Sequence, residues 1–290
     1  MTTAKADDKF VRVGNVRTRY RIAGSGDRAI ILLHGVGGYI ETWDDVMAKL
    51  ADHYSVYALD LPGHGHTGTG IEDFRVNTLS DFLVGFMDAV DLKRAHLAGL
   101  SFGTCVAVGC AARHPERVDQ LVLVSPAFLD GTVPLQFRIA SVPVLGPWLC
   151  KRLLPESRSD VERMAKQVIH RPENRTDAWI KRTHEMISRP SNKDGFCRVG
   201  RANLALSGRK AAVFDPLDRF LEATDEEILL VHGAEDATIP LGAARLLEET
   251  ISNADLIVFD DCGHEVPHER PADLTDRLRE FFETTDGGPV

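Results

Sequence analysis

The stretch Leu97-Ala98-Gly99-Leu100-Ser101-Phe102-Gly103 decides the fold of this 290-residue chain. The apolar run at 95–100 predicts a short strand, and the small residues at 103–113 predict a helix directly after it. A chain that turns from strand to helix within one or two residues strains the residue at the corner, here Ser101, and points its side chain out of the sheet. The glycines on either side lack a Cβ atom, so neighbouring backbone can pack closely against this turn. We therefore interpret Ser101 as a hydroxyl presented at a helix N-terminus, where free N–H groups stabilise negative charge.

Size and composition are those of an ordinary globular protein. Hydrophobic residues make up 43% and charged residues 27% of the chain, and an α/β fold of this length can form one large unit. The formal net charge of -9 argues against a nucleic-acid partner, which needs clustered lysine and arginine. The polar segment 1–9 lacks the apolar core of a signal peptide, and no apolar run approaches the ~20 residues of a membrane span. We therefore expect no membrane span and a cytoplasmic location.

The five cysteines are scattered along the chain, and no two of them have CxxC spacing. An odd number of unclustered cysteines is typical of a reducing compartment. We therefore expect all of them to be unpaired thiols. They are Cys105, Cys110, Cys150, Cys197 and Cys262.

Strands and helices alternate over most of the sequence. Roughly alternating polarity predicts a hairpin over 10–23, and continuous apolar runs predict buried strands at 29–33, 54–59, 121–124, 228–231 and 256–259. Helical patterns follow at 41–53, 78–90 and 271–283. Such alternation predicts an α/β fold with a mostly parallel, doubly wound sheet. The tail 284–290 is predicted to be disordered.

The segment 129–216 differs from the rest of the chain. It has no buried-type strand, and its recurring prolines separate amphipathic helical patterns. We predict a helical cap subdomain at 129–216, inserted after the sixth strand of a core domain formed by 1–128 and 217–290. The aromatic residues of this segment, Phe137, Trp148 and Trp179, have two interpretations, the lining of a tunnel for the acyl chain and the interior of the cap, and we favour the interior.

Candidate acid–base residues follow the predicted strands at their carboxyl ends, where α/β sheets gather their working residues. His264 comes just after the last strand, and Asp236 comes just after the preceding one. A serine nucleophile needs a base within hydrogen-bond reach, and the base needs an orienting acid. Ser101, His264 and Asp236 therefore form a candidate triad. Other candidates for the acid stay open: Glu235, and more weakly Asp260 and Asp261.

Acyl transfer also needs N–H donors aimed at the oxyanion of the tetrahedral intermediate. Phe102 supplies one backbone N–H by position, because it follows Ser101 directly. The glycine-rich loop 34–38, at the end of a predicted strand, supplies the second, most simply from Val36.

Five motifs in one order make the chain resemble the α/β-hydrolase superfamily, in its capped, lipase- and esterase-like branch. They are His34-Gly35-Val36-Gly37-Gly38, the segments 60–65, 99–103 and 233–240, and Gly263-His264 followed by Pro267, Glu269 and Pro271. The resemblance implies an α/β-hydrolase fold with Ser101 as nucleophile, Asp236 as acid and His264 as base. It also implies an oxyanion hole formed by the backbone amides of Val36 and Phe102, and no metal or cofactor.

The same resemblance gives three other histidines a structural interpretation. His64 and His66 lie in a glycine-rich loop of the family and are interpreted as structural or solvated residues, not as a metal pair. His34 is expected to pack behind the oxyanion loop.

Serine at the strand-to-helix turn favours acyl transfer, whereas the related epoxide hydrolases and haloalkane dehalogenases place aspartate there. The leading hypothesis is hydrolysis of a small, apolar carboxylic ester through an acyl-enzyme. One alternative is a carbon–carbon hydrolase of aromatic ring-fission products; such enzymes typically carry Asn before the nucleophile and Trp after the catalytic histidine, where this chain has Leu100 and Glu265. Another alternative, from a different class, is a small-molecule receptor that retains the triad.

Overall fold

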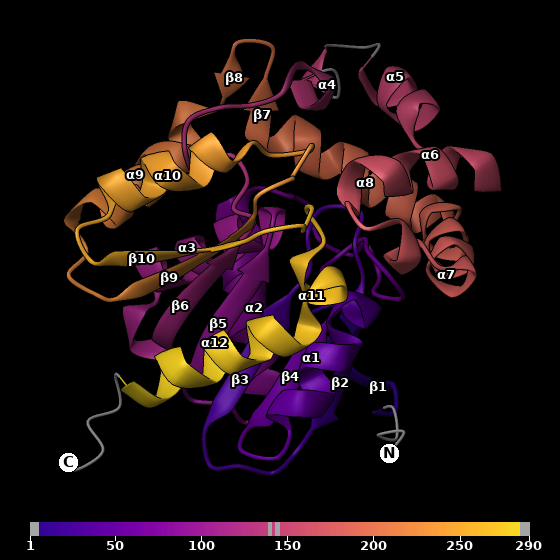
Figure 1. Ribbon diagram of the computed structural model, residues 1–290. Helices are drawn as coiled ribbons and strands as arrows, with labels where there is room; N and C mark the ends of the chain where they lie inside the picture. Colours follow the sequence, from indigo (N-terminus) through magenta and orange to yellow (C-terminus); the bar gives the residue numbers. More distant parts are fainter. Residues whose placement is uncertain (1–5, 139–140, 143–145, 285–290) are drawn as a thin grey trace.

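An eight-stranded sheet forms the centre of the computed structural model, which describes residues 6–138, 141–142 and 146–284 (Figure 1). The strands lie in the order β1-β2-β4-β3-β5-β6-β9-β10. They are β1 (Lys9–Val13), β2 (Val16–Ala23), β3 (Ala29–Leu33), β4 (Ser55–Leu59), β5 (Ala95–Leu100), β6 (Val118–Val124), β9 (Ile228–Gly233) and β10 (Ala254–Phe259). β2 pairs antiparallel with β1 and β4, and the remaining pairs are parallel. The predicted mostly parallel sheet is confirmed.

Helices cover both faces of this sheet. On one face pack α2 (Val76–Ala89), α3 (Phe102–Arg113), α9 (Ala211–Ala223) and α10 (Leu241–Thr250). On the other face pack α1 (Asp44–Leu50) and α12 (Pro271–Thr284). A short 3-10 turn, η1 (Ile40–Trp43), precedes α1, so the helix predicted at 41–53 is shorter and begins with a tighter turn.

The central strands are buried along their whole length because both faces are covered. In β3, Ile31 and Leu33 belong to the core cluster beneath α2 and α3, and Ile30 and Leu32 belong to the cluster beneath α1 and α12. All four side chains are fully buried. Each contributes roughly 2 kcal/mol by leaving water. This burial explains why the sequence of β3 is apolar at every position.

The segment between β6 and β9 is mainly helical. It contains α4 (Leu135–Arg138), α5 (Gly146–Leu153), α6 (Arg158–Val168), α7 (Asp177–Ile187) and α8 (Pro190–Asn203), which gather at one end of the sheet in Figure 1. A two-stranded hairpin of β7 (Leu204–Ala205) and β8 (Gly208–Arg209), which the sequence pattern does not predict, follows α8. The predicted boundary at residue 216 lies inside α9, whose Phe214 and Leu217 belong to the core cluster beneath α3.

The aromatic residues of this segment do not share one environment. Trp148 on α5 is 60% exposed, and the guanidinium of Arg152 lies 5.5 Å from the centroid of its ring. The expectation that Trp148 fills the cap interior is therefore wrong. Phe137 packs edge-on against Phe128, with ring centroids 5.6 Å apart, and both Phe137 and Trp179 line the cavity described below.

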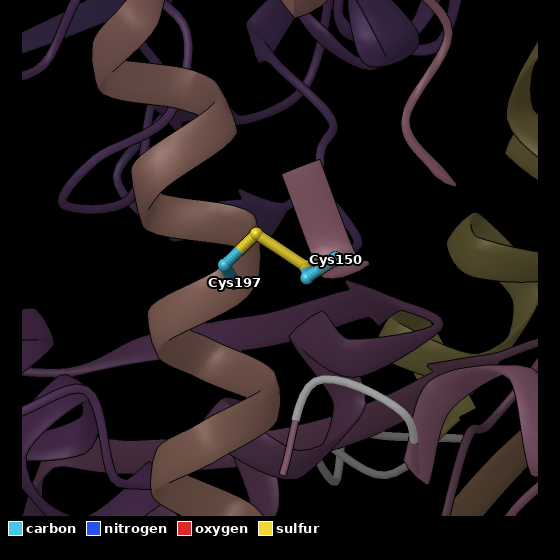
Figure 2. The surroundings of a disulfide bond; sticks show 2 residues. All are labelled: Cys150 and Cys197. Atoms are coloured by element: carbon cyan, nitrogen blue, oxygen red, sulfur yellow. A yellow bond between two sulfur atoms is a disulfide. The ribbon is translucent and has the colours of Figure 1, made fainter. Parts of the chain in front are cut away.

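Two of the five cysteines form a disulfide, so the expectation of five unpaired thiols is wrong. Cys150 on α5 and Cys197 on α8 are joined with their Cα atoms 5.9 Å apart, although 47 positions separate them in the sequence (Figure 2). Packing of α5 against α8 brings the two together at a distance that suits a disulfide. Cysteines 105, 110 and 262 are free and buried. The inference of a reducing compartment from unpaired cysteines therefore loses its basis.

Three other expectations concerned membrane spans, metal sites and the tail of the chain. Within the described residues, no helix combines the length and apolar character needed to cross a bilayer. In the same part of the chain, no cluster of three or more His, Cys, Asp or Glu side chains is arranged to hold a metal ion. The tail predicted to be disordered lies, from residue 285 onward, outside the described residues.

Candidate active site

Ser101 occupies the corner between β5 and α3. Its backbone has φ 53° and ψ -120°, a conformation that is strained for a residue with a side chain. The Ser101 amide donates to the carbonyl of Val124 on β6, at 2.9 Å, and so ties the corner to the neighbouring strand. The strained turn expected from the sequence is present.

Glycines allow three chain segments to meet at this corner. A Cβ atom on Gly103 would lie 2.6 Å from the carbonyl oxygen of Leu33, and one on Gly99 would lie 2.5 Å from the backbone of Gly103. A Cβ atom on Gly35 would lie 3.0 Å from the Cβ of Ser101. The glycine-rich loop 34–38 therefore packs directly against Ser101, close to the first turn of α3.

Asp236 and His264 meet in the loops that follow β9 and β10. The Nδ1 atom of His264 lies 2.7 Å from Oδ2 of Asp236, and both side chains are buried. The other carboxylate oxygen of Asp236 accepts hydrogen bonds from the amides of Thr238 and Ile239, at 2.7 and 2.9 Å. These bonds fix the carboxylate so that it orients the imidazole.

The other candidate acids have different partners. Glu235 accepts a hydrogen bond from the amide of Cys262, at 2.9 Å, and so braces the loop before His264. Asp261 is exposed and pairs with Arg171, at 2.7 Å. The structure thus brings Asp236 to His264.

Asp236 and His264 shift the pKa of one another so that the charged form of each is stabilised. Burial acts to raise the pKa of Asp236, but the charge and hydrogen bond of His264 outweigh it, and the pKa is lowered. Burial acts to lower the pKa of His264, but Asp236 outweighs it with help from Glu265 and Glu269, and the pKa is raised. The pair therefore favours an imidazolium beside a carboxylate, the state that forms after a histidine accepts a proton.

His34 packs behind the glycine-rich loop, where it was expected. Its Nδ1 lies 2.7 Å from the carbonyl oxygen of Gly35, and its Nε2 accepts from the amide of Leu61, at 2.9 Å. Burial lowers the pKa of His34 to about 4, so the ring is neutral near pH 7. The neighbouring His64 is also fully buried, and burial lowers its pKa to about 3. Both rings therefore act as neutral structural groups.

Two buried carboxylates that belong to the sequence motifs, but for which the sequence predicted no role, hold the loops of the site. Asp60 accepts from the amide of Ile40, at 2.8 Å, and thereby anchors the end of the glycine-rich loop. Glu269 accepts from the amides of Gly263 and Arg171, at 2.8 and 2.9 Å, and ties the segment after α6 to the residue before His264. Their membership of the sequence motifs is the signal from which a structural role could have been predicted.

One cavity of about 1070 Å³ joins these parts. Ser101 and His264 line it, as do Val36 and Phe102. The opposite wall comes from the segment between β6 and β9 and is mixed in character: it includes Met164, Trp179, Phe196 and the cationic residues Arg152, Arg163 and Lys193. A large cavity that combines apolar walls with a few polar groups is typical of a small-molecule site.

Fold and site together define a class of protein. A family model described as the alpha/beta hydrolase fold matches residues 28–271 of the chain. The chain therefore belongs to the α/β-hydrolase family, and the fold class predicted from the sequence is confirmed.

Individual relatives resemble the chain over nearly its full length. An uncharacterised protein of Mycobacterium bovis is 29% identical over 283 residues, which cover 96% of this chain and 82% of that protein. The 2-hydroxymuconate semialdehyde hydrolase of Pseudomonas sp. strain CF600 is 27% identical over 286 residues, covering 95% of this chain and 93% of that enzyme. Among solved structures, a meta-cleavage product hydrolase from Pseudomonas fluorescens IP01 matches with a TM-score of 0.79 at 27% identity, covering 96% of this chain and 98% of that one. Family and relatives together support a hydrolase.

Proposed function

We propose that the protein is a serine hydrolase that cleaves small carboxylic esters through an acyl-enzyme on Ser101. The observation that carries the proposal is the 2.7 Å contact between His264 and Asp236, beside the cavity that Ser101 also lines. The strained backbone of Ser101 adds to it, because this conformation presents a nucleophile at a helix N-terminus.

In the proposed mechanism each group has a defined role. The Oγ atom of Ser101 forms a bond to the ester carbonyl carbon while its proton passes to Nε2 of His264, since Nδ1 faces Asp236. The amides of Val36 and Phe102 stabilise the oxyanion. His264 then gives the proton to the leaving alcohol as the carbon–oxygen bond breaks, and the same residue activates the water that releases the acid. The segment 129–216 acts as a cap that forms the outer wall of the cavity.

A second candidate is cleavage of a carbon–carbon bond in an anionic ring-fission product. It is favoured by two of the relatives above, which are named as hydrolases of 2-hydroxymuconate semialdehyde and of a meta-cleavage product, and by the cations Arg152, Arg163 and Lys193 in the cavity wall. Leu100 and Glu265 argue against it, because they stand where such carbon–carbon hydrolases typically carry Asn and Trp. We therefore place ester hydrolysis first.

A substrate panel separates these candidates. Purified protein is assayed with p-nitrophenyl esters of increasing acyl length and with a 2-hydroxy-6-oxodienoate, beside the Ser101→Ala variant. We expect ester turnover that falls by several orders of magnitude in the variant. Activity on the dienoate alone would overturn the ester assignment in favour of carbon–carbon cleavage. Tight ligand binding without repeated turnover would overturn both in favour of the receptor alternative.

A further inference from the structure

Glu265 places a carboxyl group in the wall of the cavity directly after His264. Its backbone is held on both sides: its amide donates to the carbonyl of Val168, at 3.0 Å, and its own carbonyl accepts from the amides of His268 and Glu269, both at 2.9 Å. The side chain is half-buried. The backbone that carries this carboxyl is thus held by the same loop that holds His264.

Among the residues that the structure describes, none forms a hydrogen bond or ion pair with the carboxyl of Glu265. Two other carboxylates that act on it electrostatically have partners of their own. Glu269 accepts two backbone hydrogen bonds, and Asp236 binds His264. A half-buried carboxyl that faces a cavity without a donor leaves hydrogen-bonding capacity for whatever enters the cavity.

A pair of hydroxyl groups adds to this polar corner. Tyr39 and Thr183 both line the cavity, and their hydroxyl oxygens lie 2.6 Å apart. Burial raises the pKa of Tyr39, and the nearby carboxyl of Glu265 contributes to the rise. Burial also raises the pKa of Glu265; Glu269 and Asp236 add to this rise, and His264 and His268 oppose it. The corner is therefore polar.

We propose that Glu265, flanked by the Tyr39–Thr183 hydroxyl pair, forms a substrate subsite that selects a hydrogen-bond donor such as a hydroxyl group and excludes a carboxylate. The inference rests on the proposed function, since it names the substrate class of the same site: esters with a donor group on the chain that enters this corner.

The preference follows from the chemistry of the three groups that compete for the corner. A hydroxyl donates to the carboxyl of Glu265 and satisfies it. A methyl group of the same size desolvates the carboxyl and leaves it without a donor. A carboxylate places like charges side by side, with Asp236 and Glu269 close by. A site built around a polar group rejects analogues that lack the matching group more strongly than an apolar pocket does.

The test uses ligands that no hydrolase cleaves, so that binding is measured apart from turnover. Three methyl ketones of matched length end in a hydroxyl, a methyl or a carboxylate group: 8-hydroxyoctan-2-one, nonan-2-one and 7-oxooctanoate. We expect the protein to bind the hydroxyl ketone about ten- to hundredfold more tightly than the methyl ketone, measured by calorimetry, and the carboxylate ketone most weakly.

Two variants separate hydrogen bonding from charge. In Glu265→Leu, the preference for the hydroxyl ketone is expected to vanish. In Glu265→Gln, whose amide oxygen still accepts a hydrogen bond, the hydroxyl preference is expected to persist while the exclusion of the carboxylate ketone weakens. Glu249→Leu is the matched control, because Glu249 is exposed on α10 and does not line the cavity; it should bind all three ketones as the unaltered protein does.

The outcomes are distinct. Equal affinity of the unaltered protein for the hydroxyl and methyl ketones overturns the subsite, even if a variant fails to fold. Tightest binding of the carboxylate ketone also overturns it and points to the cations of the cavity wall. Failure of the proposed function is visible separately, as a lack of ester turnover by the protein with Ser101 intact.

Discussion

The carboxylate of Asp236 lies 2.7 Å from Nδ1 of His264 across a sequence separation of 28 residues. This relationship follows from the sheet, because β9 and β10 are neighbouring parallel strands whose last residues, Gly233 and Phe259, are paired. The loops after two such strands leave the same edge of the sheet. Two side chains that are distant in sequence are thereby brought into hydrogen-bond contact.

Replacing Asp236 should therefore affect turnover far more than replacing the adjacent Glu235. In Ser-His-Asp hydrolases the corresponding Asp-to-Asn change costs about 10⁴-fold in kcat, and we expect a loss of that order for Asp236→Asn. Glu235→Gln loses the same charge but keeps an oxygen that accepts from the Cys262 amide, so its kcat should stay within about tenfold of the unaltered protein. Steady-state kinetics on one ester measures kcat for both variants. A larger loss of kcat in Glu235→Gln than in Asp236→Asn would make Glu235 the orienting acid.

The turn at Ser101 should not tolerate a methyl group on Gly103. The added Cβ of Gly103→Ala would lie 2.6 Å from the carbonyl oxygen of Leu33 and 2.7 Å from that of His34, and neither backbone segment can move cheaply. We expect a loss of about 1–3 kcal/mol in the free energy of unfolding, with displacement of the glycine-rich loop from Ser101. The control is Gly242→Ala in α10, where nothing lies within 4 Å of the added atom; it should be neutral or stabilising. Similar destabilisation of both variants in urea would contradict the crowding argument.

Much of the fold was predictable because local sequence patterns determine it. The strands β3 and β5 have the predicted bounds, since strands buried on both faces are mostly apolar, and His96 is the one ionisable residue in the two strands. The turn at Ser101 and the loops after β9 and β10 were identified by motifs that need particular small or chemically active residues. These features depend on neighbours in sequence.

Other features depend on packing between distant segments and were not predictable. Cys150 and Cys197 become partners only when α5 packs against α8. The exposure of Trp148 reflects the side of α5 on which it lies, which composition does not reveal. Glu265 was noticed only as a departure from a family pattern, whereas its place in the cavity wall gives it a chemical role to test.

Acid should destabilise the protein partly through His96, a residue far from the proposed chemistry. His96 on β5 is buried against Phe282, with ring centroids 4.4 Å apart, and neither ring nitrogen has a partner in the described structure. Burial lowers the pKa of His96 to about 4, compared with about 6.5 in an unfolded chain. The unfolded state therefore binds more protons between these values, so this histidine's contribution to stability is lost as the pH falls from about 6.5 to 4.

Replacing His96 with a residue that does not titrate should make the stability of the protein depend less on pH. Between pH 7 and pH 5 the titration of His96 should lower the free energy of unfolding of the unaltered protein by about 2 kcal/mol. The total decrease over the same pH range should be smaller by this amount in His96→Leu. Urea unfolding at the two pH values measures the difference, in which any packing cost of the substitution cancels. An unchanged difference between the two pH values would show that His96 titrates normally in the fold.

The disulfide predicts the thiol content of the protein. In denaturant without reductant, three thiols should react with Ellman's reagent, namely Cys105, Cys110 and Cys262, and all five should react after reduction. The Cys150→Ser, Cys197→Ser double variant should lose about 2–4 kcal/mol of unfolding free energy, because the bridge closes a long loop in the unfolded chain. Reaction of all five thiols before reduction would instead support the original expectation from the sequence.

The most direct test of the proposed function is to trap the acyl-enzyme. The protein is mixed with excess p-nitrophenyl butyrate, quenched in acid during turnover, and analysed by intact mass and peptide mapping, with Ser101→Ala treated in parallel. We predict the added mass of one butyryl group on the peptide that contains Ser101, and none on the variant. Turnover of the ester with no adduct at Ser101, or an equal adduct on the Ser101→Ala protein, would contradict the assignment of Ser101 as the nucleophile.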